Sequence, residues 1–234
     1  MNARIQLVSF DCADTLLATR WNPAAFVQQA AEAINLDVPE SAFPQYAAML
    51  MQRWPEYRQV NETRDPSAGD AFWRKLTADW LAAQSAPPAA LDPLIQAGDE
   101  ILYGRDSTVF ELYQDVLPTL EALAQAGIRL AVLSNWDYSL HRVLRSRNLN
   151  HRFEIILASL EEGIEKPDPG IFRILLDRAG LEPAQVAHVG DNPLDDFEGA
   201  RAAGLTGIWL DRARQSSDGP IIASLLDLPR ALSL

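Results

Sequence analysis

The sequence predicts an α/β protein, in which a parallel sheet carries helices on both faces and a helical bundle is inserted into the chain. Short apolar runs that end in polar residues alternate with helical patterns through most of the sequence. Between about residues 20 and 104 this alternation stops, and no strand-like run appears. The chain has 234 residues and no low-complexity linker, so one core domain with a sizeable insertion is the economical organisation.

Five runs have the composition of buried parallel strands, which are short, apolar and rich in branched residues. They cover residues 5–10, 128–133, 154–158, 186–190 and 206–210. The first run ends at Asp11, the second at Ser134 and Asn135, and the fourth at Asp191. Polar side chains therefore follow three of the predicted strands.

Helical patterns lie between these strands, at about residues 115–125, 138–147, 168–179 and 194–203. Gly127 and Gly180 follow two of them, and glycine is the residue that most often ends a helix. The alternation predicts a Rossmann-like sheet of five or six parallel strands, formed by residues 1–17 and 107–234. In such sheets ligands bind beyond the carboxyl ends of the strands.

The inserted residues 18–106 predict a helical bundle. Four helices are expected, at about residues 23–35, 41–57, 70–84 and 91–104. Phe72, Leu76 and Trp80 recur every fourth residue, which gives the third helix a broad apolar face for the core of the bundle. Residues 58–69 are polar and rich in turn formers, so they predict an exposed loop.

The charge balance is strongly acidic, with a formal net charge of -12 and a pI near 4.6. Its scattered basic residues argue against a nucleic-acid partner and against a membrane surface. The single cysteine, Cys12, cannot form an internal disulfide, and the first residues contain no apolar stretch of secretory or membrane-spanning length. We therefore expect a cytoplasmic protein, as a monomer or a homodimer.

Four residues far apart in the sequence are expected to meet at one end of the sheet: Asp11, Ser134, Lys166 and Asp191. Two carboxylates can hold a hard divalent cation such as Mg²⁺, which prefers oxygen ligands. A carboxylate can also act as the nucleophile in phosphoryl transfer, through an aspartyl-phosphate. The set predicts a site for a small phosphorylated substrate, with Asp11 as the best placed nucleophile.

Four segments resemble the ordered motifs of the haloacid dehalogenase superfamily. They read FDCADTLL, VLSNWD, EKPDPGIF and VGDNPLDDFEGARAAG, and they span Phe10 to Gly204. The helical insertion resembles the small cap of the subgroup that contains phosphoglycolate phosphatase-like enzymes and the dehalogenases. This resemblance implies a metal-dependent hydrolase with a Rossmann-like core and a cap that carries substrate specificity.

The resemblance also implies a role for each residue of the four motifs. Asp11 would be both nucleophile and metal ligand, Ser134 and Asn135 would hold the phosphoryl group, and Lys166 would balance charge on nucleophile and substrate. Asp191 would be the second metal carboxylate.

Three further residues take implied roles around the metal. Ala13 would offer its backbone carbonyl to the cation, a contact that does not depend on the side chain. Either Asp195 or Asp196 would be an acid bonded to a metal-bound water or to the lysine, since the spacing admits both.

Ala13 departs from the motif, because the family's phosphatases carry there a second aspartate that protonates the leaving alcohol and then activates water. Such acid-base assistance is worth about a hundred- to ten-thousand-fold, so its loss predicts a slow enzyme. Asp14 follows directly and replaces the missing carboxylate only if the loop is not extended, because neighbours on an extended segment point to opposite faces. Otherwise Asp14 is a structural turn residue.

Two other functions stay open. The dehalogenases also lack the second aspartate, but they typically carry tyrosine at the position of Ala13 and lack a metal-binding aspartate in the fourth motif. This chain keeps Asp191, which favours phosphate over a haloacid. A protein that has lost catalysis and binds a ligand or a partner is the third reading, and Ala13 is its direct support.

His188 lies inside the predicted strand that ends at Asp191. A buried, hydrogen-bonded structural role is expected for it rather than catalysis.

Overall fold

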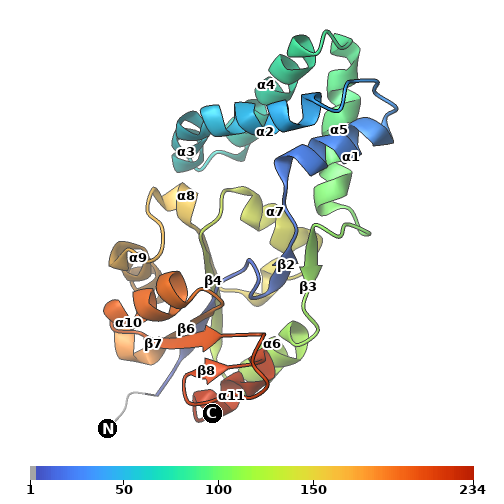
Figure 1. Ribbon diagram of the computed structural model, residues 1–234. Helices are drawn as coiled ribbons and strands as arrows, with labels where there is room; N and C mark the ends of the chain where they lie inside the picture. Colours follow the sequence, from blue (N-terminus) through green and yellow to red (C-terminus); the bar gives the residue numbers. More distant parts are fainter. Residues whose placement is uncertain (1–3) are drawn as a thin grey trace. The chain divides into compact units, whose positions relative to one another are not determined.

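The computed structural model describes residues 4–234, which divide into two compact units (Figure 1). The core unit comprises the chain up to Ala18 together with Leu112–Leu234, and the helical unit comprises Thr19–Glu111. The sequence placed the corresponding divisions after residues 17 and 106.

The core unit is built on a six-stranded sheet with the order β5-β4-β1-β6-β7-β8, in which every neighbouring pair is parallel. Its strands are β1 (Leu7–Phe10), β4 (Arg129–Ser134), β5 (Ile155–Ala158), β6 (Val186–Gly190), β7 (Thr206–Leu210) and β8 (Ile221–Ile222). All residues of β1 and β6 are buried, as expected for central strands covered on both faces. The predicted α/β class is confirmed.

Helices surround this sheet (Figure 1). They are α6 (Val116–Gln125), α7 (Ser139–Ser146), α8 (Ser159–Glu162), α9 (Pro169–Ala179), α10 (Gly199–Ala202) and α11 (Leu228–Ala231), with a π-helical turn, η4 (Pro193–Glu198). The side chain of Asp168 accepts from the backbone N–H of Gly170 at the start of α9, and Gly180 ends the helix in the left-handed conformation. Phe172 and Leu175 of α9 pack in one core cluster with Leu133 and Leu157 of the sheet.

Three short strands were not predicted from the sequence. β2 (Leu17–Thr19) and β3 (Phe110–Leu112) form a separate two-stranded sheet, in which the chain passes between the two units. The sixth strand of the main sheet, β8, has only two residues. Runs of two or three residues are too short to show an alternating pattern, so the sequence offered no signal for them.

The helical unit contains α1 (Pro23–Ala33), α2 (Ala42–Gln52), α3 (Trp54–Glu62), α4 (Pro66–Ala83) and α5 (Leu91–Tyr103). The apolar face predicted for the third helix is confirmed, since Phe72, Leu76 and Trp80 are all buried. The ring of Trp80 packs edge-on against Tyr46, with 5.7 Å between their centroids, and its Nε1 donates to the carbonyl of Ala42 at 2.8 Å.

Two predictions for this unit were wrong. The single helix expected over residues 41–57 is two helices, which break beside Pro55, a residue without a backbone N–H. The exposed loop expected over residues 58–69 is mostly helical. There Asp65 caps α4 through the N–H of Ser67, and the buried Asn61 donates to the carbonyl of Tyr57 at 2.8 Å. Two polar residues of this segment therefore act as a helix cap and as a buried, hydrogen-bonded amide. Composition alone does not distinguish these roles from those of loop residues.

Within residues 4–234, no helix is both long enough and apolar enough to cross a bilayer.

Candidate active site

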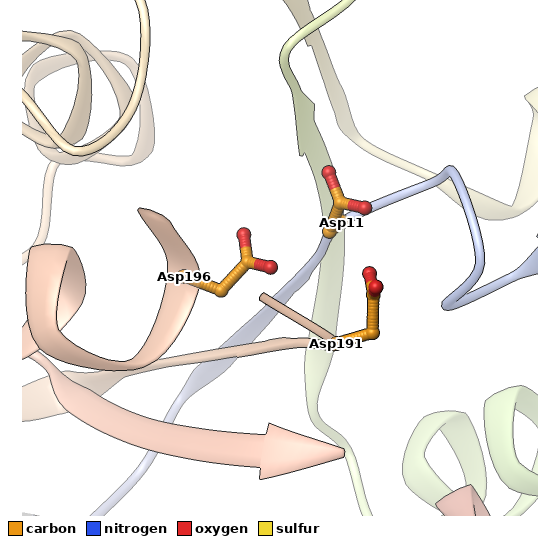
Figure 2. Close-up of side chains that lie close together, drawn as sticks. All are labelled: Asp11, Asp191 and Asp196. Carbon is orange, nitrogen blue, oxygen red and sulfur yellow. The ribbon is translucent and has the colours of Figure 1, made fainter. Parts of the chain in front are cut away.

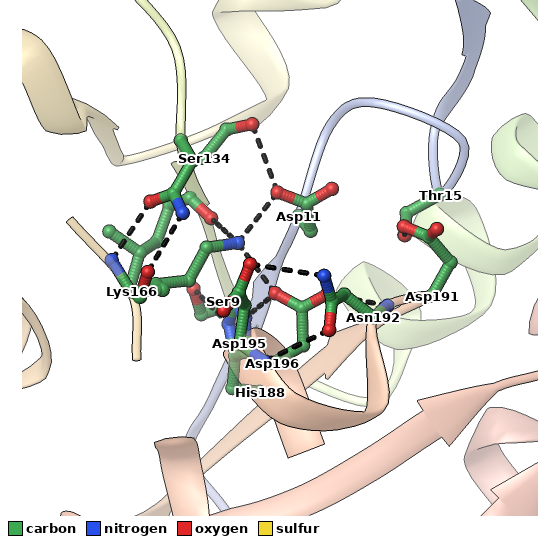
Figure 3. A network of polar contacts seen from close by, with 12 residues as sticks. Ser9, Asp11, Thr15, Ser134, Lys166, His188, Asp191, Asn192, Asp195 and Asp196 are labelled. Carbon is green, nitrogen blue, oxygen red and sulfur yellow. Dashed lines mark hydrogen bonds and ion pairs between the residues drawn. The ribbon is translucent and has the colours of Figure 1, made fainter. Parts of the chain in front are cut away.

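Three of the four residues expected at the site lie at the ends of neighbouring strands. Asp11 follows β1, Ser134 ends β4 and Asp191 follows β6. The backbone N–H of Asp11 donates to the carbonyl of Val189 at 2.9 Å, so the pairing of β1 with β6 continues up to the aspartate. Figure 3 shows these side chains, with Lys166, in one network of polar contacts.

Asp11 is buried and is held through one of its two carboxylate oxygens. Ser134 Oγ donates to its Oδ1 at 2.9 Å, and Lys166 Nζ donates to the same oxygen at 2.6 Å. Burial raises the pKa of Asp11, although the attraction of Lys166 opposes this shift. In Figure 3 the other oxygen of this carboxylate lies on the side of Asp191.

Lys166 is enclosed by acceptors. Its Nζ donates to Asp11 Oδ1 at 2.6 Å, to Asp196 Oδ1 at 2.5 Å and to the carbonyl of Leu133 at 3.0 Å. Burial alone would lower the pKa of Lys166, but the charges of Asp11 and Asp196 outweigh it, so the pKa is raised and the ammonium keeps its proton. This side chain supplies a fixed positive charge beside Asp11.

Asn135 holds the chain at Lys166. Its Nδ2 donates to the carbonyl of Lys166 at 2.9 Å, and its Oδ1 accepts from the N–H of Lys166 at 2.8 Å. Both the nitrogen and the oxygen of the Asn135 side-chain amide are therefore hydrogen-bonded to the backbone of Lys166. The Asn135 side chain positions the backbone of Lys166, and the contact with the phosphoryl group that the resemblance implies stays a prediction.

Asp191 completes a cluster of carboxylates with Asp11 and Asp196 (Figure 2), in which one oxygen of each lies within 4.8 Å of the others. Thr15 Oγ1 donates to Asp191 Oδ1 at 3.2 Å, and Trp209 Nε1 donates to the backbone carbonyl of Asp191 at 3.0 Å. Burial, together with repulsion from Asp11 and Asp196, raises the pKa of Asp191 to about 6.

The two aspartates of η4 have different surroundings. Asp196 is buried, and its Oδ1 accepts from Lys166 while its Oδ2 accepts from the N–H of Asn192 at 3.0 Å. Asp195 is half-buried and accepts from Asn192 Nδ2 at 3.0 Å. Of the two residues that the spacing admitted, Asp196 is the one bonded to the lysine.

The oxygen donors at this cluster suit a hard divalent cation. Three carboxylates, Asp11, Asp191 and Asp196, face the single positive charge of Lys166. Because both oxygens of Asp196 already accept hydrogen bonds, Asp11 and Asp191 are the carboxylates that would hold a cation. Burial and then the repulsion from Asp11 and Asp196 raise the pKa of Asp191, and Mg²⁺ would neutralise the part that comes from repulsion.

Ala13 and Asp14 lie in a tight turn. Ala13 is half-buried and forms a bridge with Leu17, and the N–H of Asp14 donates to the carbonyl of Leu17 at 2.7 Å. Asp14 is exposed and has a φ of 52°, in the left-handed region that aspartate tolerates better than most residues. The segment is thus not extended, while the acid-base role of Asp14 and the metal contact of Ala13 stay predictions.

Several residues that hold the site were not singled out in the sequence. Thr15 and Trp209 bond to Asp191, and Arg212 donates to the carbonyl of Thr15 at 2.7 Å and to Asp115 at 2.9 Å. Thr15 lies inside the first motif, which was a usable signal. Trp209 and Arg212 come from β7 and the segment after it, and nothing in their spacing relates them to Asp191.

Comparisons with known proteins agree with this geometry. A family model described as haloacid dehalogenase-like hydrolase matches residues 5–204. Haloacid dehalogenase-like hydrolase domain-containing protein 3 of Mus musculus is 31% identical over 209 residues, which cover 86% of this chain and 80% of that protein. Phosphoserine phosphatase of Thermus thermophilus is 39% identical over 115 residues, 49% of this chain and 46% of the relative.

A solved structure of a 2-haloacid dehalogenase from Pseudomonas syringae is also similar. It superposes with a TM-score of 0.62 and 30% sequence identity, over 98% of each chain. The family match itself runs from β1 past η4 and takes in Asp11, Lys166 and Asp191. The chain therefore belongs to the haloacid dehalogenase-like hydrolase family.

Proposed function

We propose that this hydrolase is an Mg²⁺-dependent phosphatase, which acts on a small phosphorylated substrate through an aspartyl-phosphate on Asp11. The observation that carries the proposal is the pair of carboxylates, Asp11 and Asp191, whose oxygens lie within 4.8 Å of each other beside a buried lysine. Displacement of halide by a carboxylate needs no cation, whereas a phosphate ester brings negative charge that one lysine does not balance.

The cation would be held by Asp11, by Asp191 and by the backbone carbonyl of Ala13. When bound, it would neutralise the phosphoryl oxygens and orient the group for in-line displacement. Thr15 and Trp209 keep Asp191 in place for this role through their hydrogen bonds to its side chain and its carbonyl.

Asp11 would attack phosphorus with one carboxylate oxygen. As the new O–P bond forms, the bond between phosphorus and the leaving oxygen breaks, and that oxygen keeps the electron pair and takes up a proton. Ser134 and Lys166, which donate to Asp11 Oδ1, are the donors closest to the nucleophile. The charge of Lys166 would stabilise the phosphoryl oxygens while they gain negative charge.

Water would then release phosphate from Asp11, and this step depends on a general base. Ala13 has no side chain that can remove the proton from water or protonate the leaving alcohol. Asp14, in its non-extended turn, is the neighbouring carboxylate that we propose for both transfers. If it acts from a poor position, turnover is slow, because this assistance is worth about a hundred- to ten-thousand-fold.

A 2-haloacid dehalogenase is the second candidate. The whole-length similarity to the Pseudomonas syringae enzyme and the absence of an acid-base side chain at Ala13 favour it. The similarity to a phosphoserine phosphatase and the carboxylate of Asp191 favour the phosphatase. The carboxylate pair bears more directly on the choice, because it concerns the atoms that would react.

The two functions are separated by one set of assays. With p-nitrophenyl phosphate, the protein is expected to release p-nitrophenol when Mg²⁺ is present and to stop when EDTA is added, and Asp11→Asn is expected to be inactive. Release of chloride from 2-chloropropionate in EDTA would support the dehalogenase instead. Phosphatase turnover that persists without any divalent cation would overturn the proposed mechanism.

A further inference from the structure

A second layer of buried polar groups lies directly beneath the site, between β1 and β6. Ser9 and His188 are both 0% exposed, and they are paired in the register of these two parallel strands. His188 Nδ1 lies 3.1 Å from Ser9 Oγ, and its Nε2 lies 3.1 Å from Asp196 Oδ1. A buried polar group without a hydrogen bond destabilises the folded protein, and here both ring nitrogens are hydrogen-bonded. The expectation that His188 is buried and hydrogen-bonded is confirmed.

The partners determine where the protons of this imidazole lie. Burial lowers the pKa of His188, so the ring is neutral and carries one proton. Burial would raise the pKa of Asp196, but Lys166 and His188 outweigh it, so Asp196 is ionised and can only accept. Nε2 therefore carries the proton and donates to Asp196, and Nδ1 accepts from the hydroxyl of Ser9. Asp196 therefore selects the tautomer, and the hydroxyl of Ser9, which can donate, satisfies the Nδ1 that this tautomer leaves without a proton.

Asp196 connects His188 to Lys166 through hydrogen bonds. Its Oδ1 accepts from both His188 Nε2 and Lys166 Nζ, and its Oδ2 accepts from the N–H of Asn192. The carboxylate is thus fixed through both oxygens, and Lys166 is bonded to it while reaching Asp11. The ring of His188 is itself packed edge-on against Phe172, with 5.4 Å between centroids.

We propose that His188 is a positioning residue for the nucleophile. His188, held by Ser9, fixes the carboxylate of Asp196, which in turn accepts from Lys166. The ammonium of Lys166 therefore keeps its hydrogen bond to Asp11, because the carboxylate of Asp196 does not move. His188 touches no reacting atom, and its contribution is made through Asp196. The inference rests on the proposed function only for its catalytic consequence, since the hydrogen-bonded chain itself is a property of the resting protein.

Two substitutions of His188 separate its two hydrogen bonds. Glutamine places an amide N–H near the position of Nε2 and can still donate to Asp196, whereas asparagine is shorter and reaches only toward Ser9. Groups that orient a catalytic residue from behind are commonly worth about ten- to a hundredfold. With p-nitrophenyl phosphate we expect kcat of His188→Asn to fall by about that factor with KM little changed, and His188→Gln to recover most of the loss. His141→Gln, at a histidine paired with Glu161 instead, is the matched control.

Magnetic resonance tests the same chain without any turnover. The sequence has three histidines and two lysines, so ¹⁵N-labelled histidine and lysine give few signals to assign. We expect the neutral Nε2–H tautomer for His188, and a Lys166 ammonium signal that moves in His188→Asn but not in His188→Gln or His141→Gln. Ser9→Ala removes only the hydroxyl on Nδ1, so it should shift the Nδ1 signal and leave the Nε2–H tautomer in place, and this test remains if the histidine variants fail to fold.

The outcomes are distinct for the two proposals. An Nδ1–H tautomer, a doubly protonated ring at neutral pH, or a Lys166 signal that is the same in His188→Asn as in the wild type would overturn the positioning role. Equal activity of His188→Asn and His188→Gln would do so as well. A wild-type protein that turns over no phosphate ester counts against the proposed phosphatase alone, and the spectra still decide the role of His188.

Discussion

At the scale of single residues, the site holds more negative than positive charge, because three carboxylates lie beside one lysine. Lys166 lies between the buried carboxylates of Asp11 and Asp196 and neutralises one charge of the cluster. Asp191 is left with a pKa raised to about 6, because it is partly desolvated and faces the other two carboxylates. The lysine therefore stabilises the folded protein, while the ionised Asp191 opposes folding as long as its charge is not neutralised.

Lys166→Met should be strongly destabilising. The substitution leaves the carboxylates of Asp11 and Asp196 buried without the ammonium group that pairs with them. Breaking a buried ion pair in this way costs about 3 kcal/mol or more. The free energy of unfolding from urea titration at pH 7 measures the loss. In the control Lys75→Met, the lysine and its partner Asp79 are exposed, so no more than about 1 kcal/mol should be lost. Equal losses in the two variants would mean that Lys166 is not the charge that holds the cluster.

The charge of Asp191 predicts an unusual dependence of stability on pH in the metal-free protein. An unfolded aspartate has a pKa of about 3.9. With the native pKa raised to about 6, the folded state binds more protons between these values, so the contribution of Asp191 to stability falls as pH rises from about 4 to about 6.

Asp191→Asn removes this ionisation. In EDTA the variant should be more stable than the wild type above pH 6 and similar to it near pH 4, as measured by urea unfolding over this range. Asp37→Asn, at an exposed aspartate of the helical unit, serves as the control and should show no such difference. A variant that is less stable than the wild type at pH 7 would contradict the unfavourable charge assigned to Asp191.

Part of the site was predictable residue by residue. Asp11, Ser134 and Asp191 could be found because each follows a recognisable apolar strand, and parallel strands bring their carboxyl ends to one edge. The choice between Asp195 and Asp196 could not be made, because it depends on the π-helical turn of η4. A turn of that kind changes which side chains point back at the sheet, and its sequence looks like an ordinary helix start.

At the scale of elements, the join between β6 and η4 sets the position of Asp196. Asn192 caps η4 by accepting from the N–H groups of Leu194 and Asp195. A Cβ added at Gly190 would lie 2.1 Å from both Cγ and Oδ2 of Asp196. The strand therefore has to end in glycine for the carboxylate to fold back over it.

Gly190→Ala should displace Asp196 and loosen Lys166. Overpacking of this kind costs about 1 to 3 kcal/mol, and turnover should fall by about tenfold or more, because Lys166 loses its anchor. Gly127→Ala is the control. Gly127 has a φ of +76° and open space around its Cα, so alanine there should cost about 1 to 2 kcal/mol through backbone strain without changing turnover. If the two variants lose activity equally, the glycine at the end of β6 has no special role.

The elements themselves were predictable where they are long and periodic. Five of the six strands of the core sheet follow from apolar runs, and α9 follows from its helical pattern and from caps such as Asp168 and Gly180. Residues 58–69 are mostly helical although their composition predicts a loop. Asp65 and Asn61 are residue types common in loops, but here they act as a helix cap and as a buried, hydrogen-bonded amide. Such roles depend on tertiary contacts, which cannot be predicted from composition.

At the scale of the whole molecule, a formal net charge of -12 gives the protein little general attraction for an anionic substrate. Positive charge has to be supplied locally, and Lys166 supplies part of it at the carboxyl ends of the strands. A divalent cation would supply the rest. If so, it binds the folded chain and not the unfolded one, and the stability of the core is linked to the cation concentration.

Addition of Mg²⁺ should therefore raise the unfolding free energy of the wild type. At a concentration one hundred times the dissociation constant, the expected gain is about 2.7 kcal/mol. Thermal unfolding at pH 7 with and without Mg²⁺ measures it, with sodium chloride of equal ionic strength as the control. Asp191→Asn should lose the gain. An equal gain in Asp191→Asn, or none in the wild type, would argue against a cation held by this carboxylate.

The most direct measurement is a crystal structure of the protein soaked with Mg²⁺ and beryllium fluoride, which adds to a nucleophilic carboxylate as a phosphoryl group would. We expect the fluoride adduct on a carboxylate oxygen of Asp11 and a cation bound by Asp11 and Asp191. An unmodified Asp11 with no cation between these two carboxylates would contradict the account.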